Sequence, residues 1–221
     1  MEKILEKNIV KGGGFLFNHP HFSEIFIPEE FNDEQKMIAK ATQDFIDKEV
    51  FPFVERIDAL EEGFMSSIMT KAGDLGLLGV CIPEQYGGLG MSFNTGMLIA
   101  DIVASTGSFT TAFGAHTGIG TLPILYYGDD AQKEKYLPNL SSGKWKACYC
   151  LTEPDSGSDA NAAKTKAVLS EDKQHYFISG QKMWISNAGF ADLFIVFAKI
   201  EHDKNLTAFI VEKSFGGITM N

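Results

Sequence analysis

The sequence predicts an α+β protein, with an all-helical domain first and an antiparallel β domain after it. Between residues 31 and 143, apolar side chains recur at spacings of three and four, which is typical of amphipathic helices. Between residues 144 and 221, short runs rich in aromatic and β-branched residues alternate with polar turns, which is typical of strands. Because the two kinds of element are grouped, segregated layers are favoured over an alternating parallel sheet.

An irregular arm is expected before the helices. Residues 1–30 show no sustained period and contain the 12–14 glycine run, Pro20 and Pro28. We expect this arm to lie against the main body.

Each expected helix has its own signal. Asn32 followed by Gln35 resembles a capping box, so a helix is expected to begin there. Pro52 is expected to kink that helix. Asp129 followed by Gln132 predicts a second cap. The further helices are expected over 64–74, over 92–102, within the small-residue stretch 107–128, and from Asp129 to about Pro138.

The expected strands are short and apolar. They cover 145–151, 175–178, 193–199 and 206–211. A further strand is expected to begin near Gly216, so we expect the β domain to be incomplete at Asn221.

Composition excludes several classes of function. The formal net charge is −10, which repels phosphate backbones, so no nucleic-acid partner is expected. A bound nucleotide must then be held by local donors. Cys81, Cys148 and Cys150 lack a zinc spacing, so no metal site is expected and a reducing compartment is indicated. No apolar run reaches the roughly 18–20 residues that span a bilayer. We expect a cytoplasmic protein, with a processed mitochondrial matrix protein as the alternative.

Two segments are candidate binding sites. From Tyr149 to Ala160 a strand runs into a Pro/Gly/Ser loop that gathers hydroxyl and backbone N–H donors, although such loops are often plain turns. In the second segment, Trp184 and Ser186 are expected to alternate on one strand and to offer an aromatic plane beside a hydroxyl. The alternative is that Trp184 lies in the core.

Other chemistry-bearing residues are expected to be structural. His116 is interpreted as a hydrogen-bonded core histidine, and Cys148 and Cys150 as small buried residues on one strand face. Glu153 and Asp159 are interpreted as carboxylates that shape their loop.

Four ordered motifs resemble the acyl-CoA dehydrogenase family. They are Pro83-Glu-Gln-Tyr-Gly-Gly-Leu-Gly90, Gln132-Lys-Glu-Lys-Tyr-Leu-Pro138, Tyr149-Cys-Leu-Thr-Glu-Pro-Asp-Ser-Gly-Ser-Asp159 and Gly180-Gln-Lys-Met-Trp-Ile-Ser-Asn187. The segments Gly114-Ala-His116, Phe194-Ile-Val-Phe-Ala-Lys199 and Gly216-Gly-Ile-Thr219, with the 12–17 arm, look most like the very-long-chain branch.

The resemblance implies a three-domain fold, FAD as cofactor, and conversion of fatty acyl-CoA to trans-2-enoyl-CoA in fatty acid β-oxidation. The C-terminal four-helix bundle, which carries the glutamate base, would be absent from this chain. No residue here would then be catalytic, and the chain alone is expected to be inactive. The residues implied to bind the cofactor are Tyr149, Cys150, Leu151, Thr152, Glu153, Pro154, Asp155, Ser156, Gly157, Ser158, Trp184, Ile185 and Ser186.

Finer roles are implied by the same resemblance. Thr152 would bond the flavin pyrimidine edge, Trp184 would pack on the isoalloxazine, and Ser186 would donate near N5. Ser158 would face both cofactor and substrate, and the small Thr110 and Gly114 would leave room for a long acyl chain. The small residues are also explained by close helix packing. Asp155 departs from the family pattern, in which this position is often small or uncharged. Its carboxylate would repel the flavin pyrophosphate unless it points to solvent.

The partners implied are an acyl-CoA substrate, an electron-transfer flavoprotein as acceptor, and further copies in a homodimer or homotetramer. Two alternatives stay open. An acyl-CoA oxidase would use the same fold but let oxygen reoxidise the flavin. A non-catalytic flavin- or acyl-CoA-binding assembly partner would need no base.

Overall fold

The computed structural model describes residues 10, 13–201 and 203–220. The chain divides into two compact units, residues 1–40 and 41–221. Part of the expected arm, including Gly12, and the terminal Asn221 lie outside the described residues. No helix in the described part is both long enough and apolar enough to cross a membrane.

The first unit contains short helical turns. The helix α1 (Gly14–Phe17) is followed by two 3-10 turns, Phe22–Glu24 and Pro28–Glu30, and by the start of α2 (Asp33–Phe45). The predicted capping box is confirmed, because Gln35 N–H donates to Asn32 Oδ1 at 2.8 Å and Asn32 N–H donates to Gln35 Oε1 at 3.0 Å.

The region around Pro52 departs from regular α-helix. A π-helical turn (Ile46–Val50) and a 3-10 turn (Phe51–Phe53) separate α2 from α3 (Val54–Asp58). Proline lacks an N–H, and its ring clashes with the carbonyl four residues earlier, so the preceding turn widens. The irregularity at Pro52 is confirmed, and it begins earlier, at Ile46.

The remaining helices make up the helical layer between Phe64 and Ser141, whose C-terminal part packs against the sheet. They are α4 (Phe64–Asp74), α5 (Phe93–Val103), α6 (Ser108–Gly114), a π-helical stretch (Ala115–Gly120), α7 (Leu122–Tyr127) and α8 (Asp130–Ser141). The Asp129–Gln132 cap is confirmed, with Gln132 N–H donating to Asp129 Oδ1 at 2.8 Å. The expected end near Pro138 is wrong. Leu137 and Leu140 are fully buried, and their packing outweighs the hydrogen bond that Pro138 cannot make.

The expected order of a helical domain and then a β domain is confirmed, but the sheet is mixed, which corrects the expectation that it is antiparallel. Its strands are β1 (Ala147–Cys150), β2 (Lys166–Leu169), β3 (Tyr176–Ser179), β4 (Leu193–Ile200) and β5 (Thr207–Glu212). The long strand β4 pairs in parallel with β1 and β2, while β4–β5 and β2–β3 are antiparallel. The long connections between β1, β2 and β4 give the chain room to return and enter in the same direction. Residues 216–220 form no strand, contrary to expectation, and they have no ladder partner in the described part of the sheet.

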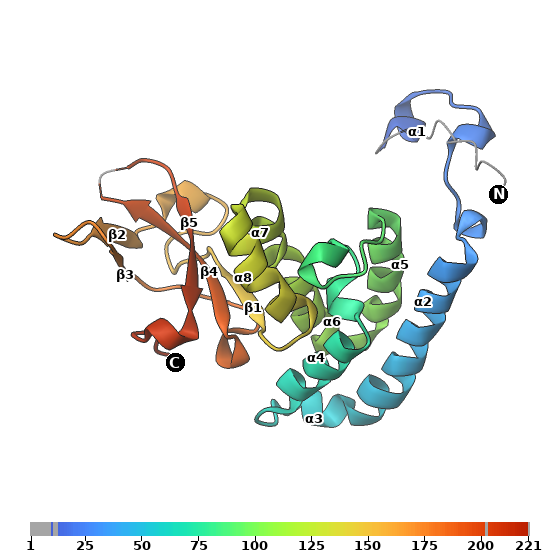
Figure 1. The fold of residues 1–221 in the computed structure, drawn as a ribbon, viewed down its shortest axis with the longest axis horizontal. Coiled ribbons are helices and arrows are strands. Elements are labelled where there is room, and N and C mark those ends of the chain that lie inside the picture. Colours follow the sequence, from blue (N-terminus) through green and yellow to red (C-terminus); the bar gives the residue numbers. More distant parts are fainter. Residues whose placement is uncertain (1–9, 11–12, 202, 221) are drawn as a thin grey trace. The chain divides into compact units, whose positions relative to one another are not determined.

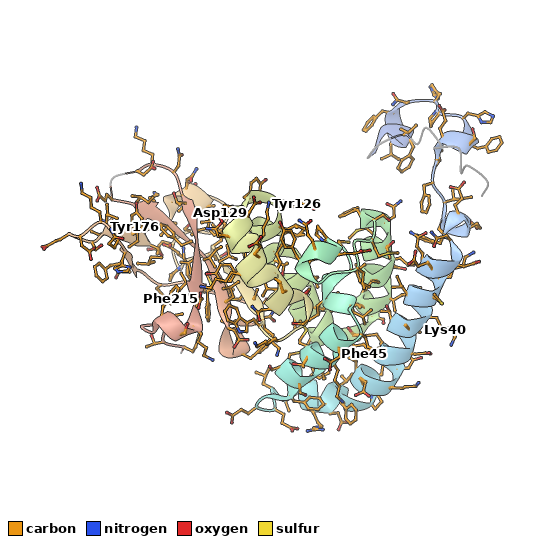
Figure 2. All side chains as sticks on the ribbon, in the orientation of Figure 1. Lys40, Phe45, Tyr126, Asp129, Tyr176 and Phe215 are labelled. Atoms are coloured by element: carbon orange, nitrogen blue, oxygen red, sulfur yellow. The ribbon has the colours of Figure 1, made fainter. Side chains whose placement is uncertain are left out.

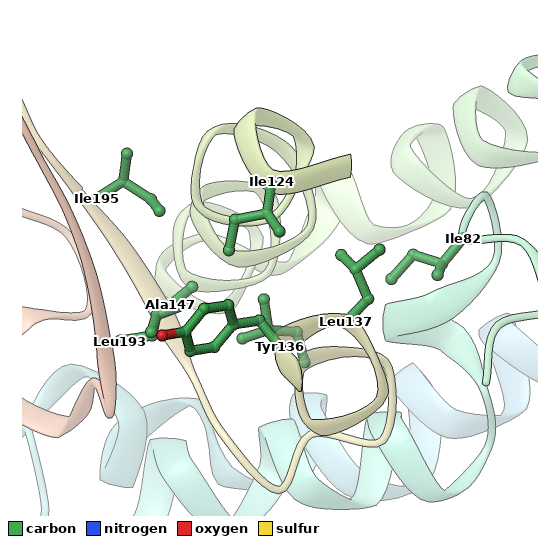
Figure 3. Close-up of a cluster of buried hydrophobic side chains, with 8 residues drawn as sticks. Ile82, Ile124, Tyr136, Leu137, Ala147, Leu193 and Ile195 are labelled. Carbon is green, nitrogen blue, oxygen red and sulfur yellow. The ribbon is translucent and has the colours of Figure 1, made fainter. Parts of the chain in front are cut away.

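The two faces of β1 pack against different partners. Figure 1 shows α7 and α8 beside β1 and β4, and Figure 3 shows the cluster that joins these layers. The buried members of the cluster are Ile82, Ile124, Tyr136, Leu137, Leu140, Ala147, Leu193 and Ile195. On the opposite face Cys148 and Cys150 pack with Ala191 and Phe194. The predicted shared burial of the two cysteines is therefore confirmed.

His116 joins the helical layer to the sheet. Its ring is fully buried, Nδ1 accepts from Ala147 N–H at 3.0 Å, and Nε2–H donates to Leu140 O at 3.0 Å. The core-histidine interpretation is confirmed. Burial, which disfavours the imidazolium, lowers the pKa of His116 to about 4.

Asn187 makes a second tie to the same strand. Its Nδ2 donates to Ala112 O on α6 at 2.9 Å and to Ala147 O at 3.2 Å. The residue is buried and its φ is +70°, a left-handed conformation that asparagine tolerates better than most residues. One side chain thus connects α6, β1 and the segment that ends at Asn187.

The first prediction concerns acid stability. The pKa of His116 is depressed in the folded state, whereas an unfolded histidine titrates near 6.5. The unfolded state therefore binds more protons below pH 6.5, and the His116 contribution to stability falls as the pH drops toward 4. Because of this residue, we expect the free energy of unfolding to fall by about 2 kcal/mol between pH 7 and pH 5. Urea unfolding at both pH values should show that the free energy of unfolding falls less in His116→Gln than in wild type. An equal fall in the two proteins would contradict the lowered pKa of His116.

The second prediction separates the two roles of Asn187. Asn187→Gly keeps the left-handed backbone but leaves two carbonyls without their donor, so we expect a loss of about 2 kcal/mol. Asn187→Ala adds a backbone penalty of about 1 kcal/mol. Urea unfolding of both variants measures the difference, and an Asn187→Ala variant as stable as wild type would contradict it.

Candidate functional site

The loop after β1 is a tight turn fixed at both ends. Glu153 N–H donates to Ser156 O at 2.9 Å, and Ser156 N–H returns a bond to Glu153 O at 3.1 Å. The Ser156 hydroxyl donates to Asp159 O at 2.9 Å. Pro154 and Asp155 occupy the exposed corner. The loop is thus both a well-formed turn and a place where donors gather.

Glu153 holds this turn from inside. Its carboxylate accepts from Lys182 Nζ at 2.7 Å, from Thr165 Oγ1 at 2.5 Å, and from the N–H groups of Lys164 and Thr165. Burial alone would raise the pKa of Glu153, but these hydrogen bonds outweigh burial and lower it to about 2. A carboxylate this well satisfied is ionised and fixed. The interpretation of Glu153 as loop-shaping is therefore confirmed.

The segment 180–187 is not a strand, which corrects the expectation for Trp184 and Ser186. Met183 N–H donates to Thr152 O at 2.9 Å, so the segment is held by the loop after β1 and has no ladder partner in the described part of the sheet. Trp184 is 85% exposed, which makes the core alternative wrong. Its φ of +60° is rare for a bulky residue and is found mainly where function or packing enforces it.

The two predicted segments lie together. The Met183–Thr152 bond and a bond from Lys182 Nζ to Leu151 O, at 3.1 Å, join them directly. Ser186 is exposed, whereas Ile185 is half-buried against the second core cluster. The hydroxyl of Thr152 and the side chains of Trp184 and Ser186 are therefore carried by two hydrogen-bonded backbone segments.

Several donors at this place are free. Within the described ranges, no partner in the chain is found for the hydroxyls of Thr152, Ser158 and Ser186, nor for the backbone N–H groups of Gly157 and Ser158. Gly157 faces open space. These groups can bind an oxygen-rich ligand without breaking an internal bond.

The negative charge of Asp155 is balanced by a lysine side chain. Its carboxylate pairs with Lys164 Nζ at 2.6 Å, and both side chains are mostly exposed. The repulsion expected from this residue is thereby reduced. Tyr149 is half-buried, with its ring centroid 4.8 Å from that of Phe197.

The substrate candidates on α6 differ from each other. The Thr110 hydroxyl is hydrogen-bonded to Val103 O and, at 2.9 Å, to Thr106 Oγ1, so it serves helix packing. Gly114 is exposed, and a Cβ there would meet no atom within 4 Å. The space beside Gly114 is therefore open among the described residues.

An apolar depression of about 320 Å³ lies beside α7 and the π-helical stretch that follows α6. It is lined by Gly118, Ile119, Leu122, Pro123, Tyr126, Tyr127 and Tyr149. Figure 2 marks Tyr126, the lining residue on α7, and Asp129, the cap residue before α8. Tyr149, on β1, thus lines the depression and is also the first residue of the candidate binding segment that runs from Tyr149 to Ala160.

Three residues of the site were missed by the sequence reasoning: Thr165, Lys182 and Asn187. Their roles depend on partners 12 to 75 positions away. A local signal existed only for Asn187, because asparagine before small residues is typical of a left-handed turn. Among the described residues, no group of His, Cys, Asp and Glu is placed to hold a metal ion.

Comparison with known proteins agrees with this architecture. Residues 32–144 match the family model of the acyl-CoA dehydrogenase N-terminal domain, and residues 148–221 match that of the middle domain. A probable acyl-CoA dehydrogenase of Bacillus subtilis is 49% identical over 96% of this chain and 36% of its own length. The human mitochondrial very long-chain specific acyl-CoA dehydrogenase is 39% identical over 87% of this chain and 31% of its own length.

A solved structure gives the same result. The crystal structure of an acyl-CoA dehydrogenase complexed with FAD, from Bacillus anthracis, has a TM-score of 0.91 and 48% identity over 95% of this chain. This chain covers 36% of that one, so it spans about a third of the length of these three relatives. With two family models matched in order over residues 32–221 and the fold shared, the chain belongs to the acyl-CoA dehydrogenase family.

Proposed function

We propose that this chain supplies the helical and β parts of an FAD-dependent enzyme that converts fatty acyl-CoA to trans-2-enoyl-CoA. The observation that carries the proposal is the exposed Trp184 beside the hydroxyls of Thr152 and Ser186, which have no hydrogen-bond partner in the part of the chain that the structure describes. Family membership and the FAD-bound relative support it.

The residues present fit a flavin. An aromatic plane that is 85% exposed suits a flat heteroaromatic ring, which would cover it from water. Thr152 and Ser186 would donate to the oxygen and nitrogen atoms of that ring, and Gly157 and Ser158 would offer backbone N–H groups to a phosphate. In a chain of net charge −10 such local donors are the means of holding an anionic cofactor.

The work of these residues would be alignment and exclusion of water. FAD, when bound, would supply the hydride acceptor. Thr152, Trp184 and Ser186 would fix the position of the reacting plane, because the segments that carry them are held by Glu153 and Asn187. Ser158 would lie where cofactor and acyl-CoA meet. The abstraction of the α-proton is assigned to no residue of this chain.

The open space at Gly114 and the apolar depression beyond Gly118 support a long acyl chain as substrate. Fatty acid β-oxidation in the cytoplasm is the setting that we propose, with an electron-transfer flavoprotein as acceptor and a homo-oligomer as the working form.

The decisive experiment is anaerobic mixing of the full-length protein with palmitoyl-CoA. We expect the flavin absorbance near 450 nm to bleach and trans-2-enoyl-CoA to form. Hydrogen peroxide released in air at the rate of substrate loss would instead indicate an oxidase. Binding without bleaching would indicate the non-catalytic partner.

The third prediction tests Trp184. Trp184→Ala should weaken FAD binding about tenfold, because stacking on an aromatic plane contributes on the order of 1 to 3 kcal/mol, and it should leave the melting temperature almost unchanged. Flavin fluorescence titration of the apo-protein measures the affinity. Leu60→Ala is the matched control, since Leu60 is also 85% exposed with a positive φ, of +54°. Equal affinities in the two variants would count against the assignment.

The fourth prediction tests the acyl space. Gly114→Leu fills open volume beside α6, so the preferred chain length should shift to shorter acyl groups while short-chain turnover is retained. Gly114→Ala should give an intermediate profile. The ratio of kcat/KM for palmitoyl-CoA and butyryl-CoA should fall more than tenfold in Gly114→Leu. An unchanged ratio would show that the space is not used.

A further inference from the structure

A buried ion pair joins the two segments of the site. Glu153 and Lys182 meet at 2.7 Å, with side-chain exposures of only 5% and 11%. Because desolvation offsets most of the attraction between two buried charges, such a pair is weak evidence for a role in stability. Its position calls for a different account.

We infer that Glu153 and Lys182 are positioning residues that set Thr152 against Trp184 and so shape the FAD site. The inference rests on the proposed function, and it assigns neither residue to the chemistry.

Three consecutive residues of the loop are held from the other segment. Lys182 Nζ donates to Leu151 O at 3.1 Å and to Glu153 Oε1, which flank Thr152, while Met183 N–H donates to Thr152 O itself. Trp184 follows Met183 directly. Any shift of the loop relative to Trp184 would therefore break three hydrogen bonds at once.

The carboxylate end of the pair is fixed independently. Thr165 donates to Glu153 Oε1 through both its N–H and its hydroxyl, and Lys164 N–H donates to Oε2 at 2.6 Å. A Cβ on Gly180 would lie 2.3 Å from Thr165 Oγ1, so the glycine lets the segment before Lys182 approach this residue. Lys182 is thus held in a fixed position relative to β2, because Glu153, its partner, is bound by Thr165, and Thr165 directly precedes that strand.

The test uses the full-length protein with Lys182→Met, Glu153→Gln and the double variant. Lys182→Met keeps the apolar stem but removes the donor to Leu151 O. We expect its affinity for FAD to fall at least tenfold, measured by flavin fluorescence in the apo-protein. Lys135→Met is the matched control: it breaks the Lys135–Glu212 pair, which joins α8 to β5 at 2.6 Å outside the site, and should leave FAD affinity unchanged.

The double variant separates positioning from stability. Lys182→Met leaves a buried carboxylate without its ion-pair partner and should lower the melting temperature. Adding Glu153→Gln removes that charge and should recover part of the loss, because the amide oxygen keeps the bonds from Thr165 while the amide NH2 faces the N–H of Lys164. FAD affinity should not recover, since Leu151 O still lacks its donor. Affinity that recovers in parallel with the melting temperature would overturn the inference.

A readout without cofactor keeps this result distinct from the proposed function. In apo-protein labelled with 5-fluorotryptophan, the ¹⁹F resonance of Trp184, assigned with Trp184→Phe, should move in Lys182→Met and stay in Lys135→Met. An unmoved resonance in a folded Lys182→Met variant would overturn the inference even if wild type binds FAD. A wild-type protein that binds no FAD would refute the proposed function, and the ¹⁹F comparison would still decide whether Lys182 places Trp184.

Discussion

The site depends on how one residue, Ala147, is held at the start of β1. Its N–H is bound by His116 from the helical layer, and its carbonyl is bound by Asn187 from the far end of the site. Two buried side chains thus replace ladder bonds at the point where the strand leaves the helices. Because β1 leads into the loop at Thr152 and Asn187 ends the Trp184 segment, both halves of the site are positioned relative to the same residue, Ala147.

The charge at the site differs from the charge of the whole chain. The protein carries a net charge of −10, yet two carboxylates of the site are balanced locally, Glu153 by Lys182 and Asp155 by Lys164. The donors of Thr152, Gly157 and Ser158 are left for a ligand. An acidic protein can therefore present a neutral, donor-rich surface where an anion binds, which is a local property that composition does not reveal.

Local signals predicted local structure well. The caps at Asn32 and Asp129 and the helix Phe64–Asp74 follow from neighbouring residues alone. The strand pairing did not follow, because parallel contacts of β4 join residues far apart in the chain. Trp184 was misplaced on a strand for the same reason: its backbone is set by Thr152 and Asn187, and hydrogen bonds across such separations leave no mark in a short window.

The π-helical stretch Ala115–Gly120 has an evolutionary consequence. Such a turn arises when a helix absorbs one extra residue. Because the extra residue is taken up within the turn, removing one residue there would restore an α-helix and leave Leu122 and Tyr126 on α7 facing the apolar depression as before. The change would fall on Gly118 and Ile119, which line the depression from within the stretch. A single codon gained or lost here can therefore remodel one part of the cavity wall while α7 and the sheet stay as they are.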